Sequence, residues 1–284
     1  MKLKTFEVDP KTQKYRFNDL LLHVRPYYLV PLNSSLNPGD PEQIDMAGGG
    51  VSAAVQMYIV DEGAFEGALL SCHRTAACLI DLYDDVHKRH LTGRPCHVDT
   101  IFGTGQEPFI LPESIFLEKR HSLQVQATDL SGQANEIRLV IGGQRIFSDR
   151  IRDDKVDQYI RNRILRARYM LPYLCPLDTE PVLTALQANV EHYFTQDAVG
   201  HFDVRKITFS SSGDFKFRII DETGQEITGG WVHSAAGLGT GAEPYIFYSP
   251  FVIRAGGVVR FIFTDLSDAE NTIYMTLSGR LIYL

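Results

Sequence analysis

The sequence predicts a mainly β protein with two tandem duplicated antiparallel β-sandwich modules of the jelly-roll kind, joined by a short linker helix. Three observations support this prediction. Short stretches of alternating apolar and polar residues recur about every ten residues and are separated by turn residues. A long segment of the chain is repeated 136 positions further on, as from Thr92 to Thr228. One long segment has the periodicity of an amphipathic helix.

The repeat aligns residues 85–146 with residues 221–282 without a gap. The similarity is concentrated in short strings: TG at 92 and 228, GTGQEPFI and GTGAEPYI, and TDLSxxxN in both copies. Identities that keep the same order in both copies indicate tandem duplication. YYLVPL and PYLCPL extend it weakly upstream. A chain of 284 residues also suits two domains. We therefore expect residues 1–147 to hold an N-terminal arm and the first module, and residues 148–284 to hold the linker helix and the second.

The strands are predicted from period-two alternation of apolar residues, and each copy ends in two of them with TDLSxxxN between. Because Asp, Ser and Asn bond to their own backbone, this string predicts a hairpin connection. Gly143 and Gly279 follow, where a β-bulge or a turn suits a residue without Cβ. The residues expected to face the core are Leu123, Val125, Ala127, Ile137, Leu139, Ile141, Ile273, Met275 and Leu277. Earlier strands are expected at 55–60, 67–71, 77–83, 204–209 and 214–220.

The linker helix is predicted over residues 150–170, and Pro172 is expected to end it. Its apolar face holds Val156, Ile160, Ile164 and Ala167. Its arginines complement the helix dipole: Arg161, Arg163, Arg166 and Arg168. They are candidates for contact with nucleic acid or an acidic partner, although a charged face on a connecting element is favoured over either. A shorter helix is expected within residues 14–26. Residues 27–50 are expected to form an extended arm that is ordered against a neighbouring subunit.

The charge balance argues against a chain that coats nucleic acid, because 35 acidic residues outnumber 28 basic ones. The N-terminus lacks the apolar core of a secretory signal, and no apolar run is long enough for a membrane span. The cysteines follow no metal-site or CxxC spacing: Cys72, Cys78, Cys96 and Cys175. They suit free thiols in a reducing cytoplasm, while a bridge between Cys72 and Cys78 stays open.

The sequence contains no catalytic motif, and we predict neither catalytic residues, nor a cofactor, nor a metal site. His97 is followed by Asp99, but its counterpart His233 is followed by Ala235, so a turn histidine that bonds local backbone is predicted. GTGxEP lacks the P-loop pattern and predicts a glycine loop that leads into a strand. The basic residues 87–90 suit a hairpin tip. The nine histidines lack the spacing of a cupin-like metal set.

Trp231, with Tyr245 and Tyr248 downstream, admits two interpretations. These aromatic rings could form a platform for a sugar or another ligand. Alternatively, they belong to the core or to a subunit contact, and β spacing then predicts that alternate members are buried.

Residues 128–143 and 264–279 each read as a strand, TDLSxxxN, and a strand that ends in Gly, after a Pro-punctuated apolar strand. This pattern resembles structural proteins of tailed bacteriophages, whose β-sandwich or jelly-roll modules decorate the head or build the neck and collar. The resemblance implies a non-enzymatic virion protein that is assembled in the host cytoplasm without a membrane. Its partners would be other virion proteins and copies of itself, in a trimer, hexamer or ring. Duplication lets a trimer imitate six-fold surroundings. The alternative is a carbohydrate- or ligand-binding protein such as an adhesin.

Overall fold

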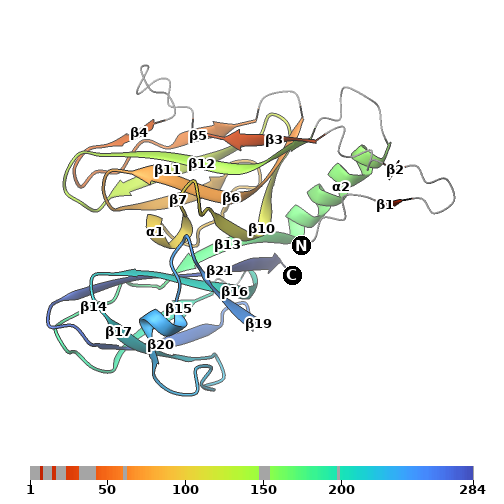
Figure 1. The fold of residues 1–284 in the computed structure, drawn as a ribbon. Coiled ribbons are helices and arrows are strands. Elements are labelled where there is room, and N and C mark those ends of the chain that lie inside the picture. Colours follow the sequence, from red (N-terminus) through yellow and green to blue (C-terminus); the bar gives the residue numbers. More distant parts are fainter. Residues whose placement is uncertain are drawn as a thin grey trace.

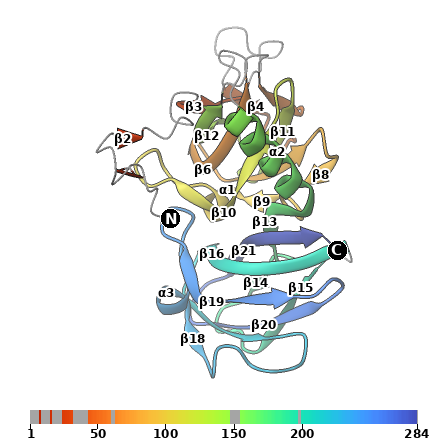
Figure 2. The ribbon, with the colours of Figure 1, turned by 90° about the vertical axis from the view of Figure 1, so that its right-hand side faces the viewer.

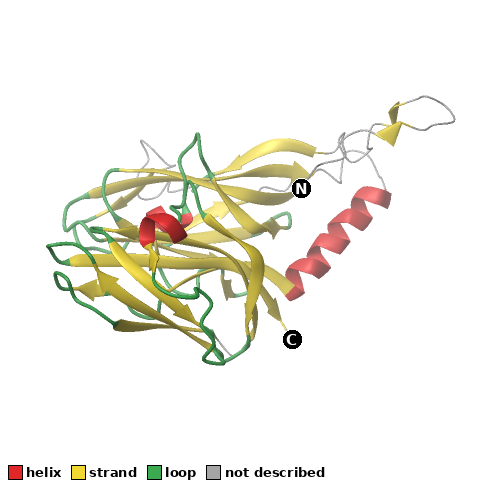
Figure 3. Cartoon of the chain, turned by 60° about the horizontal axis from the view of Figure 1, so that its bottom comes forward, coloured by secondary structure: helices red, strands yellow, loops and turns green. Residues whose placement is uncertain are grey.

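The chain forms two β-sandwiches that lie against each other, with one long helix beside them (Figures 1 and 3). This architecture is seen in a computed structural model that describes residues 7–8, 15–16, 24–31, 43–59, 63–146, 154–196 and 199–283. A small hairpin of β1 (Glu7–Val8) and β2 (Tyr15–Arg16) precedes the first sandwich. Across these described ranges, no helix is both long and apolar enough to cross a lipid bilayer.

The first sandwich, called module one, consists of two antiparallel sheets. One sheet has the order β10-β6-β12-β3, and β4 also pairs with β12. The other has the order β5-β11-β7-β8, and β9 also pairs with β7. The elements are β3 (Val24–Leu29), β4 (Gln43–Met46), β5 (Val55–Tyr58), β6 (Ala64–Arg74), β7 (Cys78–Asp84), β8 (Arg89–His90), β9 (Cys96–His97), α1 (Val98–Ile101), β10 (Phe109–Leu117), β11 (Ser122–Asp129) and β12 (Asn135–Ile146).

The second sandwich, module two, repeats this arrangement, except that β18 matches β9 and the counterpart of β8 forms only an isolated bridge between Ile220 and Glu226. Its sheets have the orders β13-β21-β16-β19, with β14 beside β21, and β15-β20-β17-β18. The elements are β13 (Met170–Pro176), β14 (Val182–Leu183), β15 (Val190–Thr195), β16 (Gly200–Ser211), β17 (Phe215–Ile220), β18 (Val232–His233), α3 (Ser234–Gly237), β19 (Tyr245–Ile253), β20 (Val258–Asp265) and β21 (Asn271–Tyr283).

The pairing order identifies both modules as jelly rolls. When the eight main strands of a module are numbered along the chain, one sheet runs 1-8-3-6 and the other runs 2-7-4-5. Two sheets of this interleaved order are the jelly-roll topology. The predicted fold class is therefore confirmed, and the strands expected from alternation occur where they were predicted. The placement of the domain boundary near residue 147 stays a prediction.

The apolar residues predicted to face inward fill the space between the two sheets of each module. The core of module two is rich in aromatic rings, and Phe215 contacts Phe263 edge to face. The core of module one also takes in Leu171 and Leu174 from β13, which is a strand of module two. The two cores are thus joined by a strand that both of them use.

The TDLSxxxN string forms the predicted connection, and Asp129 organises it. The Asp129 carboxylate accepts hydrogen bonds from Gly49 N–H (2.8 Å), Gly132 N–H (2.9 Å) and Asn135 Nδ2 (3.2 Å). The hydrogen bond from Gly49 N–H is the largest of the effects that hold the pKa of Asp129 far below its ordinary value. In module two, Asp265 accepts the corresponding bond from Asn271 Nδ2 at 2.9 Å. The same turn is therefore built twice.

The predicted bulges are also confirmed. The ladder between β12 and β6 shifts register between Gly142 and Gly143. A Cβ at Gly143 would lie 2.2 Å from the carbonyl oxygen of Glu66, and one at Gly279 would lie 2.0 Å from that of Asp203. Such close approach of two backbones admits only glycine.

Helix α2 (Asp154–Tyr169) fulfils the prediction of a linker helix within its described part. Ile160, Ile164 and Ala167 pack against Phe116 of β10, whereas residues 150–153 and the side chain of Val156 lie outside the described residues. The helix ends before β13, an edge strand that contains Pro172. An edge strand tolerates proline because one side of it needs no ladder hydrogen bonds.

Two expectations for the N-terminal region were wrong. A helix within residues 14–26 is contradicted by β2 and by the start of β3, and the residues between them lie outside the described chain. The described parts of the expected arm, residues 27–31 and 43–50, belong to module one itself. Leu29, Ile44 and Met46 are buried in its core, because their side chains complete the sheet around β12.

We predict that Gly143→Ala destabilises the protein by roughly 2 kcal/mol or more, because a methyl group would displace the Glu66 backbone. Chemical denaturation measures this loss. Gly142→Ala is the matched control, since its nearest neighbour would be the Leu69 Cβ at 3.2 Å, and its loss should be clearly smaller. Equal losses in the two variants would contradict the close approach.

Candidate functional site

Two junctions of the described chain join distant segments through polar contacts: α2 lies on β10, and the two modules meet each other. At the first junction, Arg166 donates to both carboxylate oxygens of Glu113, at 2.9 and 2.7 Å. Arg163 forms ion pairs with Glu66 and Glu113 and donates to Ser114 Oγ. Since both carboxylates are well buried, these arginines compensate charges that would otherwise be costly.

The structure therefore divides the four candidate arginines of α2. Arg163 and Arg166 bind the acidic residues of module one, whereas the side chains of Arg161 and Arg168 are exposed. Arg168 also contributes its backbone carbonyl, which accepts a hydrogen bond from Arg89 at 3.1 Å. The four residues thus form no single basic patch.

At the second junction, β13 runs beside residues 91–93 of module one. Leu174 N–H donates to the carbonyl of Leu91 at 2.9 Å, and Gly93 N–H donates to the carbonyl of Leu174 at 2.8 Å. A Cβ at Gly93 would lie 2.5 Å from both Cys175 Sγ and Tyr173 Oη, so the glycine allows the close approach. The two modules are therefore linked by backbone pairing as well as by side chains.

Three buried threonines continue this junction. Thr100 and Thr276 share a hydrogen bond between their hydroxyl oxygens at 2.7 Å. Thr208 Oγ1 donates to the Thr100 carbonyl at 2.6 Å. Because all three side chains are buried, these satisfied hydroxyls fix the relative position of α1 and the sheet of module two.

Lys206 adds a buried cation to the same junction. Its Nζ donates to the carbonyl of Ile110 and lies 5.0 Å from the ring centroid of Phe109. Burial lowers its pKa to about 8. No motif in the sequence signals this role directly, although the ladder register places Lys206 where module one has Leu69.

His97 has the structural role predicted for it. Its Nδ1 accepts a hydrogen bond from Asp99 N–H at 3.3 Å at the start of α1, and its ring stacks on Tyr274 at 4.2 Å. Burial is the main cause that lowers its pKa to about 4, so the ring is neutral at pH 7. His233 caps α3 in the same way at 3.2 Å, but it is exposed.

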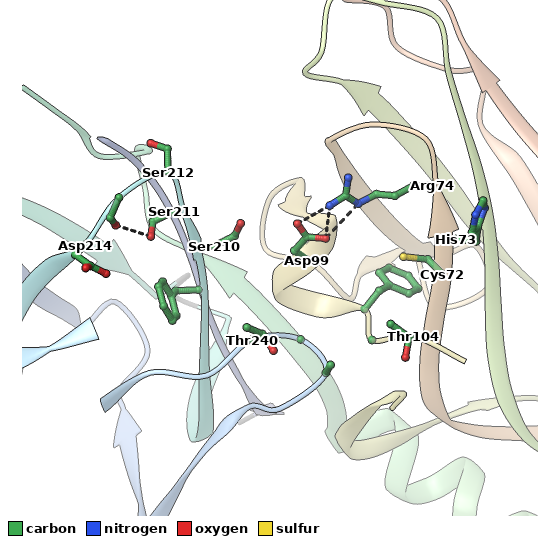
Figure 4. Close-up of a pocket in the computed structure, with 16 residues that line it drawn as sticks. Cys72, His73, Arg74, Asp99, Thr104, Ser210, Ser211, Ser212, Asp214 and Thr240 are labelled. Atoms are coloured by element: carbon green, nitrogen blue, oxygen red, sulfur yellow. Dashed lines mark hydrogen bonds and ion pairs between the residues drawn. The ribbon is translucent and has the colours of Figure 1, made fainter. Parts of the chain in front are cut away.

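A cavity of about 970 Å³ opens where the modules meet (Figure 4). Module one contributes Arg74 and Asp99, which form an ion pair at 2.6 Å, and module two contributes the hydroxyls of Ser210, Ser212 and Thr240. Cys72 also lines it, and burial raises the pKa of this thiol to about 11. Apolar residues such as Phe102 and Phe209 also line the cavity, and the charges of Arg74 and Asp99 compensate each other. Within the described ranges, no three His, Cys, Asp or Glu residues converge as metal ligands would.

The predicted hairpin tip and glycine loop are also found. The turn after β7 carries His87 and Lys88, which pair with Asp84 and Asp85. Gly103 begins the loop before β10, and a Cβ there would lie 1.9 Å from the carbonyl oxygen of Glu107. The four cysteines are free thiols.

The aromatic residues occupy two places on module two. Trp231 is partly exposed, and its ring carries Lys216 Nζ at 5.1 Å and Arg218 Cζ at 5.6 Å. Tyr245 and Tyr248 lie on β19 and are exposed, and Phe247 between them is half-buried. The predicted burial of alternate members is therefore wrong, because β19 is an edge strand on which Tyr245 and Tyr248 stay exposed, although Phe247 packs against the core.

No protein-family model and no curated protein matches the chain. Among solved structures, it is similar over 91% of its length to 97% of the STIV MCP, a viral major capsid protein, with 9% identity and a TM-score of 0.43. VP54 of PBCV-1, fitted into a reconstruction of the virophage Sputnik, aligns over 95% of its length with 92% of this chain, at 7% identity and a TM-score of 0.38. A vicilin from Solanum lycopersicum has 9% identity and a TM-score of 0.22, over 92% of this chain and 83% of its own. At such low values these likenesses carry no information about function.

We predict that Arg163→Met lowers the free energy of unfolding by about 3 kcal/mol, because it leaves Glu66 with a buried and uncompensated charge. Arg161→Met, on the exposed side of the same helix, should cost about 0.5 kcal/mol or less. Denaturant titration of both variants measures the difference. A large loss for Arg161→Met would contradict this division of the arginines.

The His97 pKa predicts a specific acid sensitivity. Because the folded state lowers this pKa from 6.5 to about 4, the unfolded chain takes up the proton more readily. The free energy of unfolding should therefore fall by up to about 3 kcal/mol as the pH drops from 6.5 towards 4. His97→Asn keeps a capping oxygen but should flatten this loss in unfolding titrations. His233→Asn, at the exposed counterpart, should leave the pH dependence of the parent unchanged.

Proposed function

We propose that the chain is a non-enzymatic structural subunit of a virus particle, which assembles with copies of itself and contacts neighbouring virion proteins. The observation that carries the proposal is a contrast between equivalent strands of the two jelly rolls. β10 is buried at Phe109 and Phe116, while β19 exposes their counterparts Tyr245 and Val252. An apolar edge strand of this length invites a partner.

The duplication of the jelly roll suggests what covers the exposed strand β19. In module one, α2 and module two cover β10, so one interface of the repeat is already formed inside the chain. The same interface formed between chains would place modules in a closed ring, with two modules from each chain. Three chains would then offer six similar positions, which suits a shell with local six-fold surroundings. Jelly rolls are a common form of capsid domain.

The finer assignment is also part of the proposal. The hairpins at 128–143 and 264–279 resemble those of tailed-bacteriophage structural proteins and support a head, decoration, neck or collar component. Such a protein would be assembled in the host cytoplasm and reside in the virion. The net charge of −7 disfavours direct contact with packaged DNA as the main interaction.

The alternative is a carbohydrate-binding protein such as an adhesin, and the exposed ring of Trp231 favours it. Lys216 and Arg218 already lie over that ring, however, which leaves less of its surface for a sugar. If this alternative holds, Trp231→Ala abolishes glycan binding and leaves folding and native mass intact.

The proposal predicts that the purified chain forms a discrete closed species, and that regular shells or sheets grow from it as the concentration rises. Light scattering across a concentration series measures the native mass, and electron microscopy shows the assemblies. A strict monomer at every concentration, together with Trp231-dependent glycan binding, would favour the adhesin and overturn the proposal.

A further inference from the structure

We infer that module two binds module one of a second copy head to tail, through an interface that repeats the one already formed inside the chain. The inference rests on the proposed self-assembly and names the two surfaces that meet. The β19 face consists of Tyr245, Tyr248 and the loop 227–229. The β3 face consists of Tyr28, Leu69 and Gly105. Figure 2 shows the two modules stacked, with β3 in the upper module and β19 in the lower.

The strand registers define which residues correspond in the two modules. In module one, Gly142 of β12 pairs with Tyr28 and with Leu69. In module two, Ser278 of β21 pairs with Leu174 and with Lys206. Since Gly142 and Ser278 are matched in the repeat, Tyr28 corresponds to Leu174 and Leu69 corresponds to Lys206.

These counterparts differ in exposure because only one of the two surfaces is covered. Leu174 lies at the centre of the internal junction and is 1% exposed, whereas Tyr28 is 70% exposed. Lys206 is buried on Phe109, whereas Leu69 is partly exposed. The β3 face therefore has the position and the apolar character of the surface that module two already presents to module one.

The β19 face shows the reciprocal contrast. Tyr245 is 43% exposed where its counterpart Phe109 is fully buried beneath Lys206 of module two. Ile227, the counterpart of the buried Leu91, is also exposed. These large apolar side chains occupy solvent positions in which the equivalent residues of module one are packed.

One glycine on each open face locates the missing contact independently of the apolar side chains. A Cβ at Gly93 would collide with Tyr173 and Cys175, whereas one at its counterpart Gly229 would meet no described atom within 4 Å. A Cβ at Gly241 would lie 2.3 Å from the Phe102 carbonyl oxygen, whereas its counterpart Gly105 is equally open. Gly105 lies on the β3 face, where it leaves space for an approaching backbone. Gly229 leaves similar space on the β19 face, although its φ of 65° also favours glycine there.

The two faces complement each other but neither complements itself. The internal junction joins the Leu91–Gly93 loop of one module to a β13-type strand of the other, through two backbone hydrogen bonds. On the open surfaces, the loop belongs to module two and the strand, β3, belongs to module one. A contact between unlike surfaces leaves one face of each kind free, so it continues until the ring closes. The occupant of the β19 face is thus the β3 face of a second copy.

A cysteine pair tests this inference in the full-length chain. Thr92 and Leu174 form a parallel β-bridge across the internal junction, and their counterparts on the open faces are Thr228 and Tyr28. Bridged residues lie close enough for a disulfide. Under mild oxidation, the double variant Tyr28→Cys with Thr228→Cys should give covalent oligomers that end at the ring size. The parent and each single variant, which keep the same four native cysteines, should give none under these conditions.

Mixing the two single variants tests the head-to-tail order. Each chain then carries one reactive face, so the mixture should yield covalent dimers and no longer species. Dimers from one single variant alone would mean that like surfaces meet, and this would overturn the inference.

Truncation of a fully exposed side chain provides a readout that does not depend on cysteine chemistry. Tyr248→Ala should weaken self-association at least about tenfold by light scattering, because it removes apolar area from the β19 face. Tyr193→Ala removes another exposed tyrosine, 44% exposed on β15 and outside both faces, and should leave association unchanged. If the parent assembles while the disulfides fail and the two tyrosine variants behave alike, this interface is wrong and the proposed function stands. A parent that never assembles overturns both.

Discussion

Two backbone hydrogen bonds between Leu174 and residues 91 and 93 are the contact on which the whole arrangement depends. They seat β13 of module two against module one, so that Leu171 and Leu174 complete the core of module one. The threonine contacts and the stacking of His97 on Tyr274 then follow from that placement. Leu174 and the three threonines of the junction are buried, and the threonine hydroxyls are hydrogen-bonded, so the junction holds the two jelly rolls in one fixed relation.

Close approach of backbones is a second constraint, and glycine meets it at matched positions in the two modules. Gly143 and Gly279 allow the bulges in the long sheets, and Gly103 and Gly239 allow the loops before β10 and β19. These positions are filled sterically within each module. Gly105 and Gly229 are different, because a Cβ at either position would meet no described atom within 4 Å. Their counterparts Gly241 and Gly93 are closely packed at the internal junction, and comparing the two modules reveals this difference. In a duplicated chain, the covered surface of one module thus shows which residues of the other module would be covered by a partner.

Charge is distributed in agreement with this arrangement. Arg163 and Arg166 of α2 form ion pairs with Glu66 and Glu113. These pairs hold the linker helix against module one and leave fewer arginines free to bind an anion from another molecule. The large exposed side chains of the β19 face and the β3 face are aromatic and aliphatic instead. A molecule with a net charge of −7 can therefore present apolar surfaces for association while the remaining surface repels non-specific contact.

Local pattern alone was sufficient for much of the fold. Alternation at Leu123–Ala127 and Ile137–Ile141 predicted strands because a half-buried strand exposes every second residue, and the repeated TDLSxxxN and Gly143 predicted the turn and the bulge. The function of His97 followed from its match with His233. The sequence could not show that Tyr28 and Leu29 continue the sheet, that Arg163 meets Glu66, or that Tyr245 is exposed while Phe109 is buried. Each of these contacts depends on which distant segments pack against each other. The periodicity of a sequence indicates only which side of a strand a residue faces, and it does not indicate what lies against that side.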